Sequence, residues 1–366
     1  MEKINISHLK QVLFSVILLV LFLILGEVIL RVIYFNRFST EYFAIDRFFH
    51  SLEFRYLTYK GKLSMEDVYK KAWENSYIER GYPVPKEGPR EGYWGDRLGR
   101  QTENQFLGWQ TPKISIKNLV EVDQHGMQHA GRKDAPCHIL IIGASVAGGA
   151  SASEISTTYF VKLFQYLEDA KKAVKVTVYA GGGWISAQEV SALLYKGLQL
   201  HPDIVIFLDG LNDLVNQINV RQLHEYRKNI PYEERASDYL ENMKVAKNLC
   251  KCNGIKIVFV LQPFLVWEKN ITVYEQDFLK QKYVGDVDML SKYYELIKKE
   301  LESLVENNVY FIDCSNVLSD EKATTFSDLW HFSDFGHDLL GKYIADKLIY
   351  ILNHCCQART SKERVD

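Results

Sequence analysis

The chain has 366 residues, of which 47% are hydrophobic and 25% are charged, and its formal net charge is -2. This balance is typical of a folded globular protein and argues against a disordered chain. The absence of a long basic run argues against nucleic acid as a partner. The length allows two ordinary domains, or one large domain with an appendage.

The first apolar segment covers residues 12–30 and reads VLFSVILLVLFLILGEVIL, with Glu27 as its only charge. A helix of this length rises about 28 Å, close to the hydrocarbon thickness of a bilayer. A cleaved signal peptide would have a shorter apolar core and a small-residue cleavage site. Glu27 and Arg31 instead stand at the i,i+4 spacing of a continuing helix. We therefore predict an uncleaved single-pass membrane anchor, with a buried soluble helix as the alternative. The flanking charges are nearly balanced and do not fix its orientation.

Residues 35–136 are rich in aromatic and charged side chains and are broken by turn signals, as in RGYPVPKEGPREGYWGDRLGR. Helical patterns cover 47–56 and 65–78 and are followed by loops. We expect a membrane-proximal accessory segment that packs on the main domain. Its aromatic residues either pack against that domain or form a platform for a sugar.

From residue 137 onward, apolar runs typical of buried strands alternate with helical patterns. The expected strands are 138–143, 174–180, 203–210, 255–263 and 309–315, and the expected helices are 156–173, 187–200, 238–253, 287–307 and 334–352. Strands buried on both faces and separated by helices predict a parallel sheet covered on both sides. The predicted fold is therefore α/β, a flavodoxin-like three-layer sandwich with a central parallel sheet of five strands.

Small and polar residues gather where these strands end, which is the edge of a parallel sheet that carries reactive groups. The residues concerned are Gly143-Ala144-Ser145, Gly183, Gly210-Leu211-Asn212-Asp213, and Asp328 and His331 in the loop after the fifth strand. Each alone has an ordinary interpretation, since a serine at a strand end often caps a helix. Together they supply every group that acyl transfer needs.

The chemistry assigns each residue a role. A serine hydroxyl such as that of Ser145 becomes a good nucleophile only when a base takes its proton, and histidine is suited to that task. Asp328 precedes His331 by three residues and can hold the imidazole in one tautomer. The oxyanion hole would consist of the N–H groups of Ser145 and Gly183 and the amide of Asn212. Two further glycines, Gly148 and Gly149, are interpreted as keeping the turn open to an acyl group.

The four blocks resemble those of the SGNH (GDSL-type) hydrolase family, which is named after a Ser, a Gly, an Asn and a His. The resemblance covers about residues 137–352 and follows the family's block order. Gly-Ala-Ser replaces the usual Gly-Asp-Ser, which affects local hydrogen bonding but not the nucleophile. A second pair, Asp334 and His337, has the same spacing as Asp328 and His331. The family pattern favours His331 as the base and makes Asp334 a helix N-cap.

The resemblance implies a membrane-anchored serine esterase or acyltransferase with Ser145, His331 and Asp328 as the triad, acting on O-acyl or O-acetyl esters of cell-envelope glycans. No cofactor is expected, and a metal is not expected because no clustered His or Asp ligands appear outside the catalytic loop. The expected partners are a small acyl ester or an acylated glycan, and the membrane through residues 12–30, with the catalytic domain outside the cytoplasm. A lipase or thioesterase acting on lipid acyl chains, and a catalytically silent scaffold, are the alternatives.

The expected organisation has four parts. Residues 1–34 form a cytoplasmic tip and the anchor, 35–136 the accessory segment, 137–354 the catalytic domain, and 355–366 a polar tail. The six cysteines lack the repeated spacing of a zinc site and are expected to be free or buried thiols, although export would permit disulfides.

Overall fold

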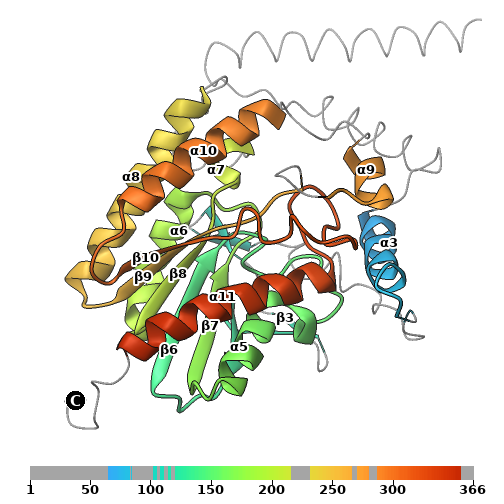
Figure 1. Cartoon of the computed structure of the whole chain (residues 1–366). Coiled ribbons are helices and arrows are strands. Elements are labelled where there is room, and N and C mark those ends of the chain that lie inside the picture. Colours follow the sequence, from blue (N-terminus) through green and yellow to red (C-terminus); the bar gives the residue numbers. More distant parts are fainter. Residues whose placement is uncertain are drawn as a thin grey trace, which may run out of the picture. The chain divides into compact units, whose positions relative to one another are not determined.

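The computed structural model describes residues 65–82, 84, 102–104, 108–110, 114–116, 120–215, 231–265, 270–279 and 287–355 (Figure 1). The predicted anchor at 12–30, the helical pattern at 47–56 and the tail beyond residue 355 lie outside these ranges. Among the described residues, none of the helices combines the length and the apolar character that crossing a bilayer requires.

The centre of the fold is an eight-stranded sheet. Five of its strands are parallel and correspond to the five predicted strands. In spatial order they are β7 (Val174–Ala180), β6 (Cys137–Gly143), β8 (Ile204–Asp209), β9 (Lys256–Leu261) and β10 (Val309–Asp313). Numbered along the chain, this order is 2-1-3-4-5, which is the flavodoxin-like arrangement. The predicted parallel core is therefore confirmed.

The prediction of a purely parallel five-stranded sheet is wrong at one edge. β5 (Met127–Gly131) pairs antiparallel with β7, and β4 (Val120–Val122) and β3 (Ile114–Ile116) extend the sheet beyond it. These strands are too short, and too polar in the case of β5, to give a periodic apolar signal. A separate antiparallel pair consists of β1 (Thr102–Asn104) and β2 (Gly108–Gln110).

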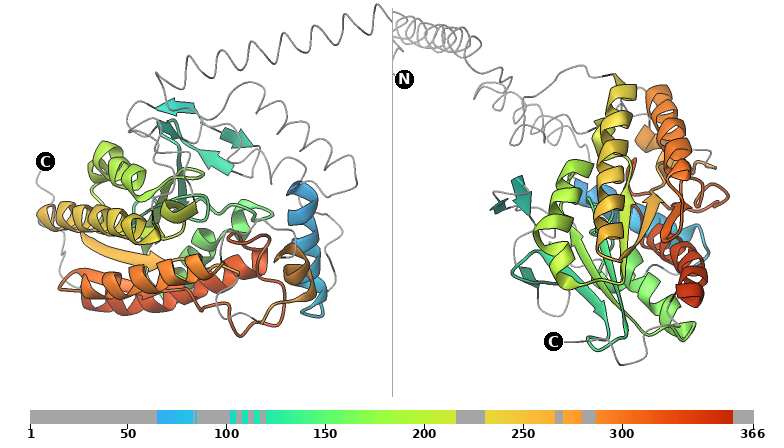
Figure 2. Two further views of the ribbon diagram at one scale, coloured as in Figure 1. Left: turned by 90° about the horizontal axis from the view of Figure 1, so that it is seen from above. Right: turned by 90° about the vertical axis from the view of Figure 1, so that its left-hand side faces the viewer.

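Helices cover both faces of the parallel half of the sheet (Figures 1 and 2). One face carries α5 (Tyr159–Asp169) and α11 (Asp334–Cys355), and the other carries α6 (Ser186–Ala192), α8 (Tyr232–Cys252) and α10 (Val287–Ser303). Successive residues of a strand point to opposite faces. Ile139 and Ile141 of β6 accordingly pack with the first helix pair, whereas Leu140 and Ile142 pack beneath the second group. Burial on both faces explains the unbroken apolar run in this strand.

The predicted helices differ from the observed ones mainly at their ends. The pattern at 187–200 continues from α6 into a π-helical turn, η2 (Leu193–Gly197), and a 3-10 turn, η3 (Leu198–Leu200). The pattern at 156–173 begins within the short η1 (Ile155–Thr157), and α5 starts after it at Tyr159. Two short helices were not expected, namely α7 (Asn212–Val215) and α9 (Val273–Leu279).

α5 and α11 lie against each other through a glycine. A Cβ atom at Gly341 of α11 would come within 2.6 Å of the Tyr159 carbonyl oxygen of α5, so no larger residue fits without a shift of the helices. The Tyr166 hydroxyl also donates a hydrogen bond to Asp338 at 2.9 Å. α5 follows the Ser145 turn and α11 follows the His331 loop, so this contact joins two parts of the site.

α3 (Met65–Ile78) has the bounds that the sequence predicts. α3 and the strands β3 to β5 lie in the same compact unit as residues 137–354. The domain boundaries given above stay predictions.

Candidate active site

The register of the sheet brings the predicted turns to one edge. Gly143, the last residue of β6, pairs with Ala180 at the end of β7 and with Leu208 near the end of β8. The turns that follow these three strands therefore begin at the same level. They carry Ser145, Gly183 and Asn212, respectively.

Ser145, His331 and Asp328 form a continuous hydrogen-bonded chain. The Nδ1 atom of His331 lies 2.7 Å from Oδ2 of Asp328, and its Nε2 atom lies 2.8 Å from Oγ of Ser145. With the Nδ1–H donating to the carboxylate, Nε2 is free of a proton and can accept the one on the serine hydroxyl. The side chains of His331 and Asp328 are only 13% and 7% exposed. This is the geometry of a serine hydrolase active site.

Asp328 is held as a carboxylate by its surroundings. Burial raises its pKa, but the neighbouring His331 and the hydrogen bonds to the carboxylate outweigh burial and lower the pKa below its ordinary value. Its Oδ1 atom accepts the backbone N–H groups of Trp330 at 2.9 Å and His331 at 2.8 Å. The same carboxyl group therefore shapes the loop and orients the imidazole.

The turn that carries Ser145 is built from small residues for steric reasons. A Cβ atom at Gly143 would come within 2.3 Å of the Leu208 carbonyl oxygen and 2.6 Å of the Ala147 methyl group. Gly149 has a φ of 72°, which favours glycine. Gly148 and Gly149 are both buried, and their N–H groups donate to the carbonyls of Ala144 and Val146. Gly149 therefore has a conformational reason to be glycine, and the interpretation that the two glycines keep the turn open to an acyl group stays a prediction.

The two remaining predicted residues belong to neighbouring turns that touch each other. Gly183 has a φ of 75°, and the Nδ2 group of Asn212 donates to the Trp184 carbonyl at 2.8 Å. A Cβ atom at Gly181 would overlap the Trp184 ring, so this turn folds tightly onto its own tryptophan. The structure thus places the glycine turn and Asn212 side by side, next to the Ser145 turn in the sheet.

Three carboxyl groups lie behind these turns, and the sequence analysis singled out only one of them, Asp213. Glu189 of α6 and Asp209 at the end of β8 are both buried, and burial raises the pKa of each. The Tyr239 hydroxyl donates to Asp209 at 2.7 Å. Burial also raises the pKa of Asp213 to about 7. Their common position between α6, β8 and α8 appears only when the chain is folded.

The second Asp–His pair has different partners. The His337 ring is fully buried, its Nε2 atom lies 3.0 Å from the Ala150 carbonyl oxygen, and it stacks on Tyr159. Asp334 accepts the N–H of Ser153 and the hydroxyl of Thr157, each at 2.8 Å. Both side chains therefore bind the segment that follows Ser145.

The loop that carries Asp328 and His331 is also held by residues that the sequence analysis missed. Glu275 of α9 is fully buried, and its Oε1 atom accepts the N–H groups of Thr325 at 3.0 Å and Phe326 at 3.1 Å. Tyr274 donates to the Ser327 carbonyl at 3.0 Å. α9 has no long periodic pattern, so these contacts could not be predicted.

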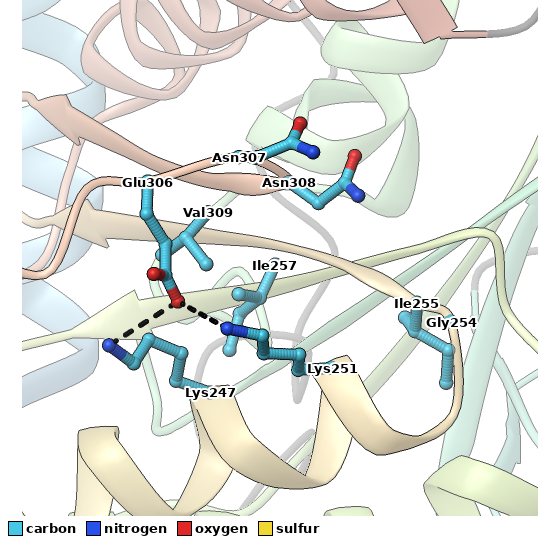
Figure 3. A pocket seen from close by; sticks show the side chains of 9 residues that line it. All are labelled: Lys247, Lys251, Gly254, Ile255, Ile257, Glu306, Asn307, Asn308 and Val309. Atoms are coloured by element: carbon cyan, nitrogen blue, oxygen red, sulfur yellow. Dashed lines mark hydrogen bonds and ion pairs between the residues drawn. The ribbon is translucent and has the colours of Figure 1, made fainter.

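A surface pocket lies at the opposite end of the strands (Figure 3). It includes Ile257 near the start of β9 and Val309 at the start of β10. Lys247 and Lys251 lie 3.6 Å and 3.3 Å from Oε1 of Glu306, so both lysines of the pocket form ion pairs with this glutamate. The pocket has none of the predicted site residues.

Among the described residues there is no group of three or more His, Cys, Asp or Glu side chains that could hold a metal ion. The cysteines whose side chains are described, Cys137, Cys250, Cys252 and Cys314, are free thiols.

The sequence matches no protein-family model and no curated protein. Among solved structures, the chain is similar to an acetyl xylan esterase, with 15% identity, a TM-score of 0.41, and coverage of 59% of this chain and 99% of that one. It is also similar to a GDSL-like lipase from Bacteroides thetaiotaomicron, with 14% identity, a TM-score of 0.41, and coverage of 59% and 89%. A family two carbohydrate esterase from Clostridium thermocellum gives 14% identity, a TM-score of 0.39, and coverage of 61% and 67%. Similarity at this level does not transfer an activity, so the function is argued from the residues themselves.

Proposed function

We propose that the protein is a serine esterase of the SGNH type that works through an acyl-enzyme. The observation that carries this proposal is the chain from Asp328 through His331 to Ser145, with hydrogen bonds of 2.7 Å and 2.8 Å. A silent scaffold would not need this alignment, which joins Ser145 to an Asp–His pair far away in the sequence. We therefore set the scaffold alternative aside.

In the proposed reaction, Ser145 Oγ attacks the carbonyl carbon of the ester while its proton moves to Nε2 of His331. The negative charge on the carbonyl oxygen is stabilised by the N–H groups of Ser145 and Gly183 and by the amide of Asn212. The imidazolium then gives its proton to the leaving alkoxide, which departs as an alcohol and leaves the acyl group on Ser145. Water or another hydroxyl group, deprotonated by His331, releases the acyl group and restores the serine.

The acyl substrate is proposed from the resemblance of the four blocks to the SGNH family. We propose O-acetyl or other short O-acyl esters of cell-envelope glycans as substrates. Hydrolase and acyltransferase share the same acyl-enzyme and differ in whether water or a sugar hydroxyl resolves it. A lipase or thioesterase would share it as well, but would prefer long acyl chains.

The first experiment is labelling with a fluorophosphonate probe, which reacts with an activated serine. Labelling of the wild type and not of Ser145→Ala supports the proposal, and an unlabelled wild type contradicts it. Hydrolysis of p-nitrophenyl esters of increasing chain length then separates an acetyl esterase from a lipase. Adding a glycan acceptor and measuring transferred acyl groups against free acid separates the transferase from the hydrolase.

We further propose that residues 12–30 anchor the protein in the membrane and that the catalytic domain lies outside the cytoplasm. The support is the length and apolar character of this segment. Cys252 offers a test, because it is the exposed thiol among the four cysteines whose side chains are described. In a variant with Cys355 and Cys356 changed to serine, a membrane-impermeant maleimide should label Cys252 in intact cells. Labelling only after lysis would contradict the orientation, and a mass lacking residues 12–30 would contradict the anchor.

A further inference from the structure

Asp334 is a junction between three parts of the fold. It lies at the start of α11, three residues after His331, and is buried. The segment after Ser145 reaches it through the N–H and hydroxyl of Ser153, at 2.8 Å and 2.5 Å. The side chain of Trp73 of α3 also lies close to this carboxylate and acts to lower its pKa. α3 therefore shares one carboxylate with the segments that carry the nucleophile and the base.

α3 makes two more contacts on the His331 side of the site. The Glu79 carboxylate, just beyond the end of α3, accepts the backbone N–H of Thr324, which is fully buried. The guanidinium of Arg80 lies 4.2 Å from the centre of the Phe335 ring, next to Asp334. The loop that bears Asp328 and His331 runs between these two points. Glu275 of α9 holds the N–H groups of the next two residues, Thr325 and Phe326.

Trp73 is buried, which indicates that this docking is more than a surface contact. The consequence for chemistry follows from the short distance between Ser145 and His331, which tolerates little displacement. Errors of about 1 Å in the placement of reacting groups can lower rates by about a hundredfold. Because α3 contacts both the segment after Ser145 and the loop that carries His331, it can control the distance between these two residues.

We propose that α3 belongs to the catalytic apparatus, with Trp73 and Glu79 as positioning residues that hold the Ser145 and His331 segments in reactive register. The inference rests on the proposed esterase function and deepens it. It gives the segment between the proposed anchor and the catalytic domain a direct part in turnover.

The test uses the full-length protein in detergent with four variants. Trp73→Phe keeps a ring but removes the N–H donor, and Glu79→Ala removes the acceptor. Glu79→Gln restores an oxygen that can accept the Thr324 N–H. Glu74→Ala, on the same helix, is the matched control, since no hydrogen bond or ion pair of Glu74 is present among the described residues. Reactive sites are counted by fluorophosphonate titration, and kcat and KM for p-nitrophenyl acetate are expressed per titrated site.

We expect Trp73→Phe and Glu79→Ala to lower kcat per titrated site by about tenfold with KM changed less than about twofold, because positioning acts on the reacting atoms. Glu79→Gln and Glu74→Ala should stay close to the wild type. A purely structural role would lower Tm and the number of titrated sites, but would leave kcat per site unchanged. That result for both Trp73→Phe and Glu79→Ala would overturn the inference. A wild type that is not labelled at all would instead overturn the proposed function.

Discussion

The carboxylate of Asp213 accepts two hydrogen bonds from Ser186, one from the backbone N–H at 3.0 Å and one from the hydroxyl at 2.5 Å. Its neighbour Asn212 donates to the Trp184 carbonyl in the same turn. Two adjacent side chains after β8 thus fasten the turn after β7. Because these turns supply two of the three proposed oxyanion donors, their mutual position determines where the oxyanion can sit.

The ionisation of Asp213 should appear in the stability of the protein. Burial raises its pKa to about 7, well above the ordinary value of an aspartate. Between about pH 4 and about pH 7 the folded chain then holds a proton that the unfolded chain has lost, so the free energy of unfolding falls as pH rises through this window. Asp213→Asn removes this group. The Tm of the wild type should therefore fall relative to that of Asp213→Asn as pH rises through the window. Parallel Tm curves for the two proteins would contradict the raised pKa.

Ser145→Ala should abolish ester hydrolysis and fluorophosphonate labelling while leaving the fold intact. Ser145 is partly exposed, so removing its hydroxyl leaves no core cavity. Ser191→Ala is a suitable control, because within the described part of the chain the Ser191 hydroxyl donates only to the Ala187 carbonyl of its own helix. Circular dichroism and turnover of p-nitrophenyl acetate measure the two properties. Turnover near the wild-type rate in Ser145→Ala would remove this residue as the nucleophile.

His331→Ala should cost nearly as much activity as Ser145→Ala, and the double variant should cost little more. Members of a triad act as a unit, so their effects do not add. The kcat values of the two single variants and the double variant, measured together, decide this point. A double variant far less active than either single variant would show that the two residues act independently.

His337→Ala should chiefly lower stability. Its loss leaves the Ala150 carbonyl without this donor inside the protein, which costs about 1–3 kcal/mol. Chemical denaturation gives the change in the free energy of unfolding, and kcat per titrated site gives the effect on chemistry. If His337→Ala were inactive and His331→Ala active, the alignment of the last block would be wrong, and Asp328 would lose its role.

Asn212→Ala should lower kcat by about two to three orders of magnitude with little change in KM, because an oxyanion donor acts mainly in the transition state and is worth about 3–4 kcal/mol. The bond from Asn212 to Trp184 adds a second route to the same loss, since the variant also frees the glycine turn. Steady-state kinetics separate the alternatives. An increase in KM with kcat preserved would make Asn212 a ligand for the bound substrate instead.

The parallel strands could be predicted because each is buried on both faces, which leaves an unbroken apolar run such as Ile139 to Ile142. The site residues could be predicted because they directly follow such runs or match a known spacing. The supporting residues could not. Glu275 and Trp73 act through contacts far away in the sequence, and no local pattern marks them. The sequence indicates Asp334 only as a helix N-cap, and its contact with Ser153 could not be predicted. The antiparallel strands at the edge of the sheet were not predicted for a related reason. β5 is stabilised by its pairing with β7 and not by its own composition.

The absence of a side chain at Gly341 has a consequence for how the reacting atoms are spaced. α5 begins after the nucleophile and α11 after the base, and the two helices touch where residue 341 meets the Tyr159 carbonyl. The distance between Ser145 and His331 therefore depends partly on how closely α5 and α11 pack. A methyl group added at position 341 would push the two helices apart. It would thereby change the distance between Ser145 Oγ and His331 Nε2, although it contacts neither atom.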